Sequence, residues 1–213
     1  PLVAKVHTEG QRYSKAGYEV ILIGHAGHAE VEGTLGQIDG PVHLVGSVAD
    51  AQKLDVKDPT KLAYVTQTTL SVDDTRDIIA TLKQRFPQIH GPDVKDICYA
   101  TQNRQNAIKD LVPKVDFLLI VGSANSSNSN RLRELGERRG VQSVLIDHPD
   151  QIQESWLAGK TRIGVSAGAS APEVLVQRIL DRLGELGVAP AQENDGQRET
   201  VVFQLPAEME AYL

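Results

Sequence analysis

Short apolar runs alternate along this chain with longer stretches in which apolar residues recur every three or four positions. The short runs are typical of buried strands and the longer stretches of amphipathic helices, and their alternation predicts a parallel-sheet α/β protein. The predicted strands are 18–23, 42–45, 61–65, 115–121, 142–146 and 161–165. The predicted helices are 71–86, 102–112, 128–139, 149–157 and 172–186, and the residues after Pro1 also follow a helical pattern.

A segment rich in breakers divides these elements into two sets. Residues 86–95 carry two prolines and a glycine, which predicts a domain boundary near residue 96. A polar stretch, 189–199, precedes a final strand-like run at 200–205.

Composition narrows the classes of partner. The chain has 22 basic and 28 acidic residues, a formal net charge of −6, which argues against nucleic acid or an anionic membrane as its main partner. Its longest apolar run, 117–121, is far shorter than the roughly 20 residues that span a bilayer. Cys98 is the single cysteine, so no intrachain disulfide forms and a reducing, cytoplasmic compartment is expected.

Three predicted strands end in loops rich in hydroxyl groups. These loops, at 65–74, 121–130 and 165–173, each open a helix. Ligands of open parallel sheets bind beyond the carboxyl ends of the strands, and helix starts rich in N–H and hydroxyl groups suit a phosphate. The alternative is that these residues only cap helices. The run 126–130 has five polar residues where one cap is enough, which favours a function for that loop.

Two further segments could carry chemistry. The motif GHAGHAEVEGTLGQ at 24–37 places His25, His28, Glu30 and Glu32 within eight residues. A histidine with a carboxylate two residues away could form a metal pair or a proton-transfer pair, and the alternative is a polar loop with a structural histidine. Cys98 precedes a predicted helix and could be a reactive thiolate, a metal ligand or a buried apolar filler. These patterns alone name no reaction.

The motifs themselves resemble those of one family. GHAGHAEVEGTLGQ, TQTTLSVDDT, DICYATQNRQ, GSANSSNSNRL and GASAPE are similar, in order and spacing, to the LytB family of 4-hydroxy-3-methylbut-2-enyl diphosphate reductases. The resemblance covers essentially all 213 residues.

The resemblance implies a fold and an activity. The family has three similar α/β lobes around a [4Fe–4S] cluster that is held by one cysteine from each lobe. This chain would then form two similar three-layer lobes with mostly parallel sheets, at 1–96 and 97–198, and a tail at 199–213. The implied activity is the reductive dehydroxylation of an allylic diphosphate to isopentenyl and dimethylallyl diphosphate in the non-mevalonate isoprenoid pathway, with ferredoxin or flavodoxin as electron donor.

The resemblance also implies roles for single residues. Cys98 matches a cluster ligand, and Glu30 matches the carboxylate that relays protons to the leaving hydroxyl. His28 matches a histidine that contacts the substrate, and Thr68 a threonine near the hydroxyl. The residues that match those holding the diphosphate are Ser126, Ser127, Asn128 and Ser170.

The chain also departs from the family pattern. The family has a cysteine directly before PLVAKVH, and here Pro1 stands in the next position, so the first lobe and two cluster cysteines are missing. We interpret this start, which lacks a methionine, as a truncation, a processing product or an engineered piece. We expect the chain alone to hold no intact cluster, to turn over no substrate and to self-associate through the faces that the first lobe covers. The competing hypotheses are a diphosphate-binding module without catalysis and a hydrolase that uses Cys98 with His25 or His28.

Overall fold

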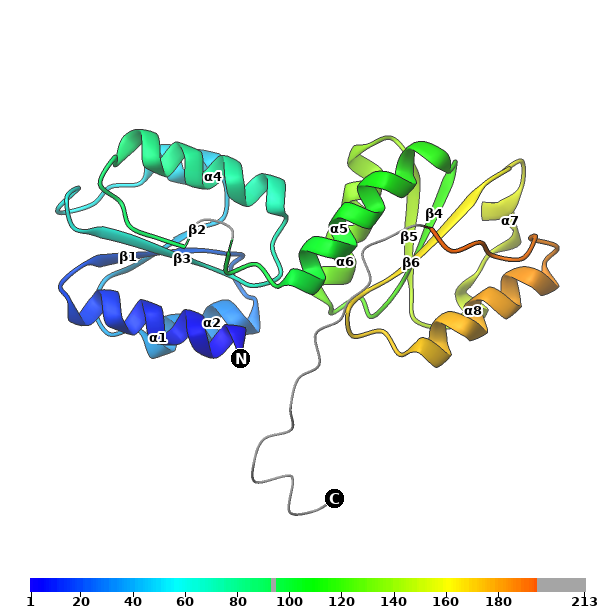
Figure 1. The fold of residues 1–213 in the computed structure, drawn as a ribbon, viewed down its shortest axis with the longest axis horizontal. Helices are drawn as coiled ribbons and strands as arrows, with labels where there is room; N and C mark the ends of the chain where they lie inside the picture. Colours follow the sequence, from blue (N-terminus) through cyan, green and yellow to red (C-terminus); the bar gives the residue numbers. More distant parts are fainter. Residues whose placement is uncertain (93–94, 195–213) are drawn as a thin grey trace, which may run out of the picture.

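The computed structural model describes residues 1–92 and 95–194, which form two layered lobes side by side (Figure 1). The sheet of the first lobe consists of β1 (Glu19–Ile23), β2 (Val42–Val45) and β3 (Leu62–Thr66). Its order is β2-β1-β3, and both strand pairs are parallel. The central strand, β1, is therefore the first in sequence. The connection from β1 to β2 and the connection from β2 to β3 cross the sheet on opposite faces.

Four helices cover the first sheet. Helices α1 (Leu2–Lys15) and α2 (Ala29–Gln37) lie on one face, and α3 (Val48–Lys53) and α4 (Val72–Arg85) on the other (Figure 1). Because side chains alternate along a strand, Val20 and Leu22 of β1 pack toward α1, while Ile21 and Ile23 pack toward α4. All five β1 residues are buried, as expected for a strand covered on both faces.

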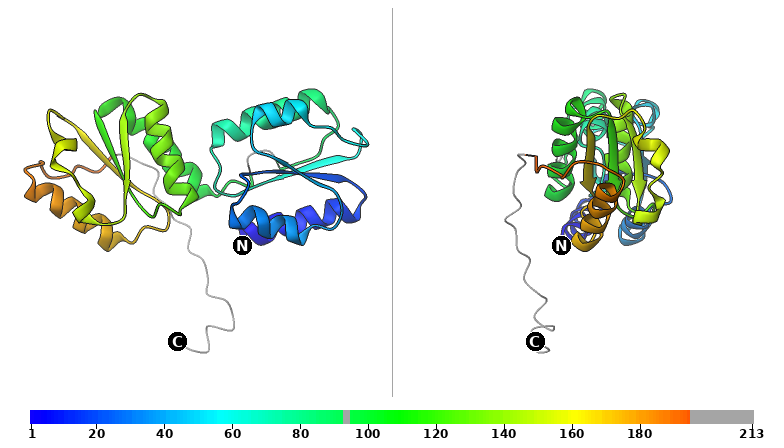
Figure 2. Two further views of the ribbon diagram at one scale, coloured as in Figure 1. Left: turned by 180° about the vertical axis from the view of Figure 1, so that it is seen from behind. Right: turned by 90° about the vertical axis from the view of Figure 1, so that its right-hand side faces the viewer.

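The second lobe repeats this plan. Strands β4 (Phe117–Val121), β5 (Gln142–Ile146) and β6 (Ile163–Ala167) form a parallel sheet of order β5-β4-β6. One face carries α5 (Tyr99–Leu111) and α6 (Ser127–Arg138), and the other carries α7 (Glu154–Leu157) and α8 (Glu173–Glu185) (Figure 2). Two 3₁₀ turns, η1 (Val112–Lys114) and η2 (Pro149–Gln151), complete the lobe.

The α/β class with parallel sheets is confirmed, and each of the six strands found in the described residues lies within two residues of its predicted range. The helices differ from the predictions in four places. The segment 29–37, interpreted as a loop, forms α2, the short helix α3 was missed, and α5 begins at Tyr99 instead of residue 102. The predicted helix 149–157 is interrupted at Ile152 and Gln153, whose extended backbones separate η2 from α7. The domain boundary near residue 96 stays a prediction, and the tail 199–213, with its strand-like run 200–205, lies outside the described residues. Among the helices of the described part, none is long and apolar enough to cross a membrane.

Side chains of the second lobe hold the loop that follows β3. The buried amide of Gln105 accepts a hydrogen bond from the Val72 N–H (3.0 Å) and donates one to the Leu70 carbonyl (2.8 Å). Arg138 of α6 pairs with Asp74 at 2.7 Å. These contacts fix the start of α4 against α5 and α6, so that the strand ends of both lobes open toward the same junction.

Candidate active site

A carboxylate in the first turn of α2, which follows β1, is joined to a threonine in the loop that follows β3. Oε1 of Glu30 accepts a hydrogen bond from the Thr68 main-chain N–H (2.8 Å), and Oε2 accepts one from Thr68 Oγ1 (3.0 Å). The two strands are parallel neighbours, so their carboxyl ends lie at one edge of the sheet. Both carboxylate oxygens are thereby fixed in place, an arrangement that can deliver a proton to a defined point.

His28 begins helix α2 next to this pair. Its Nδ1 accepts a hydrogen bond from the Glu30 N–H (3.2 Å), so the ring caps the helix. A neutral ring that accepts at Nδ1 carries its hydrogen on Nε2. His28 can therefore present a hydrogen-bond donor on its other side.

Cys98 is tied to the same loop through the main chain. Its N–H donates to the Thr68 carbonyl at 2.9 Å, and its side chain is a half-buried free thiol directly before α5. In residues 1–92 and 95–194, no group of three or more histidines, cysteines, aspartates or glutamates could hold a metal ion. One thiol is available where the family resemblance implies three. The described residues alone therefore do not fit a four-iron cluster.

The start of α6 contains a cap and an unused amide. Ser126 Oγ accepts from the Ser129 N–H (3.3 Å), which is the capping role that the sequence left open. Asn128 has no such role: it is only 5% exposed, and neither its Nδ2 nor its Oδ1 has a partner among the described residues. Burying an unpaired polar group costs about 1–3 kcal/mol, so this amide is suited to a ligand that would satisfy it.

Two glycines allow α6 to approach the strand ends. A Cβ added to Gly122, after β4, or to Gly168, after β6, would collide with the side chain of Ser129. The Gly168 N–H donates to the Val121 carbonyl at 2.8 Å, which holds the loop after β6 beside β4. Ser170 lies exposed in this loop, at the same edge as the α6 start.

Gln67 is a residue of the site that the sequence analysis did not single out. It is 1% exposed, and its Oε1 accepts from the His25 N–H at 3.1 Å. Its Nε2 donates to Thr69 Oγ1 (3.1 Å) and to Ser127 Oγ in the other lobe (3.4 Å). Its position between two threonines of TQTTL was visible, but a single glutamine gives no signal of a contact 60 residues away.

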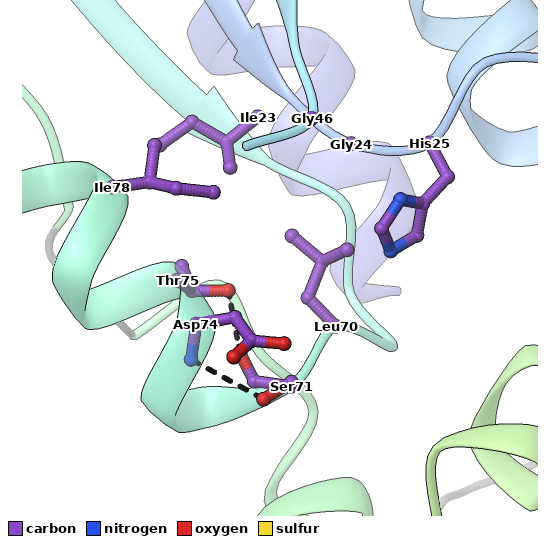
Figure 3. Close-up of a pocket in the computed structure, with 9 residues that line it drawn as sticks. All are labelled: Ile23, Gly24, His25, Gly46, Leu70, Ser71, Asp74, Thr75 and Ile78. Atoms are coloured by element: carbon purple, nitrogen blue, oxygen red, sulfur yellow. Dashed lines mark hydrogen bonds between the residues drawn. The ribbon is translucent and has the colours of Figure 1, made fainter. Parts of the chain in front are cut away.

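His25 is separate from the Glu30–Thr68 pair. It lines a small recess of about 30 Å³ with Leu70, Ser71 and Asp74, on the α4 side of the sheet (Figure 3). Burial, followed by the nearby charge of Arg131, lowers the pKa of His25 below its usual 6.5. His25 and His28 thus have different partners, because His28 caps α2 whereas His25 lines the recess beside Asp74.

These contacts define a two-lobed α/β protein in which polar side chains from the strand ends of both lobes meet, joined by the hydrogen bond from Gln67 to Ser127. The family model described as LytB protein matches residues 1–184. The chain belongs to the LytB protein family.

Curated relatives and a solved structure resemble the chain over nearly its whole length. It is 56% identical over 206 residues to the 4-hydroxy-3-methylbut-2-enyl diphosphate reductase of Ralstonia nicotianae. The matched region covers 97% of this chain and 64% of the relative. It is 58% identical over 213 residues to the reductase of the same name from Marinobacter nauticus, covering 98% of this chain and 67% of the relative. The solved E-1-hydroxy-2-methyl-but-2-enyl-4-diphosphate reductase of Plasmodium falciparum superposes with a TM-score of 0.92 at 34% identity, over 100% of this chain and 67% of that one. The chain thus spans about two-thirds of the length of the proteins it matches.

Proposed function

We propose that this chain supplies the proton-transfer pair and the diphosphate-binding loops of a 4-hydroxy-3-methylbut-2-enyl diphosphate reductase. The observation that carries the proposal is the Glu30 carboxylate, which Thr68 fixes through both oxygens beside a cysteine and a hydroxyl-rich helix start. The names of the relatives give the substrate class.

The reaction converts an allylic alcohol, two electrons and two protons into an alkene and water. Hydroxide is a poor leaving group, so breaking the carbon–oxygen bond requires a proton on the departing oxygen. In our proposal the Glu30 carboxyl group gives this proton and Thr68 aligns the hydroxyl that receives it. His28 Nε2–H faces the substrate as a hydrogen-bond donor. The second proton adds to one of two allylic carbons, which accounts for two isomeric products.

The diphosphate would lie at the start of α6. The proposed contacts are Ser126, Ser127 and Asn128 at the start of α6 and Ser170 in the loop after β6. Both segments follow neighbouring strands of the second sheet. Each hydrogen bond to a charged oxygen contributes roughly 1.5–3 kcal/mol, so a shell of neutral donors at a helix start can hold the anion without a dedicated cation. The unpaired amide of Asn128 supports this placement.

The two electrons require a cofactor that these residues do not complete. A [4Fe–4S] cluster would supply them, with Cys98 as the ligand from this chain and two further cysteines from outside it. Ferredoxin or flavodoxin is the proposed electron donor. The proposal also includes a cytoplasmic location and lobe limits at 1–96 and 97–198. It further includes self-association through the faces that the first lobe would cover.

One observation favours a second candidate, a diphosphate-binding module without catalysis. The Asn128 amide and the α6 start do not depend on any cluster, whereas the described residues offer a single thiol. Binding without turnover is the result that this candidate predicts in every preparation.

Anaerobic reconstitution with iron and sulfide separates the two candidates. The chain alone should give no stable four-iron signal by Mössbauer spectroscopy and no product. The same chain joined to the cysteine-containing family segment that precedes PLVAKVH should give both. A joined protein that binds the cluster and the substrate but forms no product would contradict the reductase proposal.

A further inference from the structure

The orientation of the Gln67 amide follows from its hydrogen-bond partners. The main-chain N–H of His25 can only donate, so the amide atom 3.1 Å from it must be the oxygen. The amide nitrogen, with two hydrogens, therefore faces Thr69 Oγ1 and Ser127 Oγ. The amide cannot be flipped without placing two donors against each other.

This orientation constrains the Ser127 hydroxyl. A serine hydroxyl has one hydrogen to donate and two lone pairs to accept. One lone pair already accepts from Gln67 Nε2, a group that cannot accept in return. The hydroxyl hydrogen must then point away from Gln67.

The same side chain also connects the two halves of the site. Gln67 directly precedes Thr68, whose N–H and hydroxyl bind Glu30. Its own main-chain N–H donates to the Ile23 carbonyl at 2.8 Å, which anchors it to β1. A buried and anchored amide thus reaches across the junction to the first turn of α6.

We propose that Gln67 is a positioning residue: by donating to Ser127 Oγ, it turns the Ser127 O–H toward the diphosphate and sets the distance between that group and the Glu30–Thr68 pair. This inference rests on the proposed function, because it needs an anion at the α6 start. It assigns no contact between Gln67 and the substrate.

The first test needs no ligand. Unfolding by urea is compared for the wild-type chain, Gln67→Met, Ser127→Ala and the double variant. The change in the unfolding equilibrium constant of the double variant should differ at least about twofold from the product of the two single changes, as for residues in contact. The matched cycle of Gln67→Met with Ser126→Ala should be additive, because the Ser126 hydroxyl binds the Ser129 N–H instead. Additivity in the Ser127 cycle overturns the inference.

The second test measures the affinity of the chain for inorganic pyrophosphate by calorimetry. Gln67→Met should weaken binding about tenfold in the wild-type background, and by less than twofold in the Ser127→Ala background. Equal losses in both backgrounds overturn the orienting role and leave the diphosphate site intact. If the wild-type chain binds no pyrophosphate while the ligand-free coupling is present, the proposed diphosphate site itself fails, and the orienting role fails with it.

The pyrophosphate affinity of Gln67→Glu tests the orientation of the Ser127 hydroxyl separately from a purely structural role of Gln67. Its near-identical shape keeps the acceptor for the His25 N–H but replaces the amide donor with a carboxylate oxygen. Ser127 O–H then donates to residue 67 instead of to the anion, so pyrophosphate affinity should fall further than in Gln67→Met, by about a hundredfold. An affinity equal to or higher than that of Gln67→Met contradicts the proposal.

Discussion

Thr68 donates to both carboxylate oxygens of Glu30, from its main-chain N–H at 2.8 Å and from its hydroxyl at 3.0 Å. The two residues are 38 positions apart. Glu30 lies in the first turn of α2, after β1, and Thr68 lies in the loop after the neighbouring parallel strand β3. The main-chain bond does not depend on the Thr68 side chain, so Thr68→Val can remove the hydroxyl bond by itself.

Thr68→Val should destabilise the chain by about 1–2 kcal/mol, since a buried hydroxyl that binds a carboxylate is replaced by a methyl group of the same shape. Thr66→Val is the matched control. Thr66 Oγ1 is buried and has no partner among the described residues, so its removal should be neutral or stabilising. Urea unfolding measures both variants. Equal destabilisation by the two substitutions would contradict the assigned hydrogen bond.

Asn128→Leu should separate binding from stability. The substitution removes an amide without partners in the described structure, so the ligand-free chain should become more stable by about 1 kcal/mol. Its affinity for pyrophosphate should fall at least about tenfold. At Asn130, whose Nδ2 donates to the Ala124 carbonyl (2.7 Å) and the Ser126 carbonyl (3.0 Å), the same change should instead destabilise the chain. Urea unfolding measures the stability of both variants, and calorimetry measures their affinity for pyrophosphate.

Gly168→Ala should loosen the start of α6. The added Cβ would collide with Ser129, and relieving this contact should cost roughly 1–3 kcal/mol and weaken pyrophosphate binding. Gly184→Ala, inside α8, is the control, because a Cβ there meets nothing within 4 Å. It should stabilise the chain by up to about 1 kcal/mol through helix propensity. Retention of full stability and affinity by Gly168→Ala would show that the close approach is not required.

The chain should lose stability as the pH falls below about 6.5. Burial lowers the pKa of His25 in the folded state, so the unfolded chain binds a proton more readily between that lowered pKa and the usual 6.5. Stability from this group is therefore present above 6.5 and is lost as the pH falls below it. His25→Gln should flatten that part of the pH profile of urea midpoints. An unchanged profile would show that His25 does not titrate differently on folding.

The sequence predicted the strands well because buried parallel strands are continuous apolar runs, such as 117–121, which leave little choice of element. It missed α2 because the apolar residues of that short helix are separated by polar and glycine positions, and the N-cap role of His28 is a matter of geometry. The candidate site was visible as local motifs. Its connections were not, since the Glu30–Thr68 bond and the reach of Gln67 to Ser127 depend on how separate loops meet in space.

The role of Glu30 tests the whole account most directly. In the reconstituted protein that includes the preceding cysteine segment, product formation from 4-hydroxy-3-methylbut-2-enyl diphosphate is compared for Glu30→Gln and for Glu32→Gln, an exposed residue of the same helix turn. Glu30→Gln keeps the shape of the side chain but cannot give up a proton, so kcat should fall about 10²–10⁴-fold while KM changes little. Glu32→Gln should retain nearly full kcat. An undiminished kcat in Glu30→Gln would contradict the proposed proton transfer and, with it, the function assigned to this site.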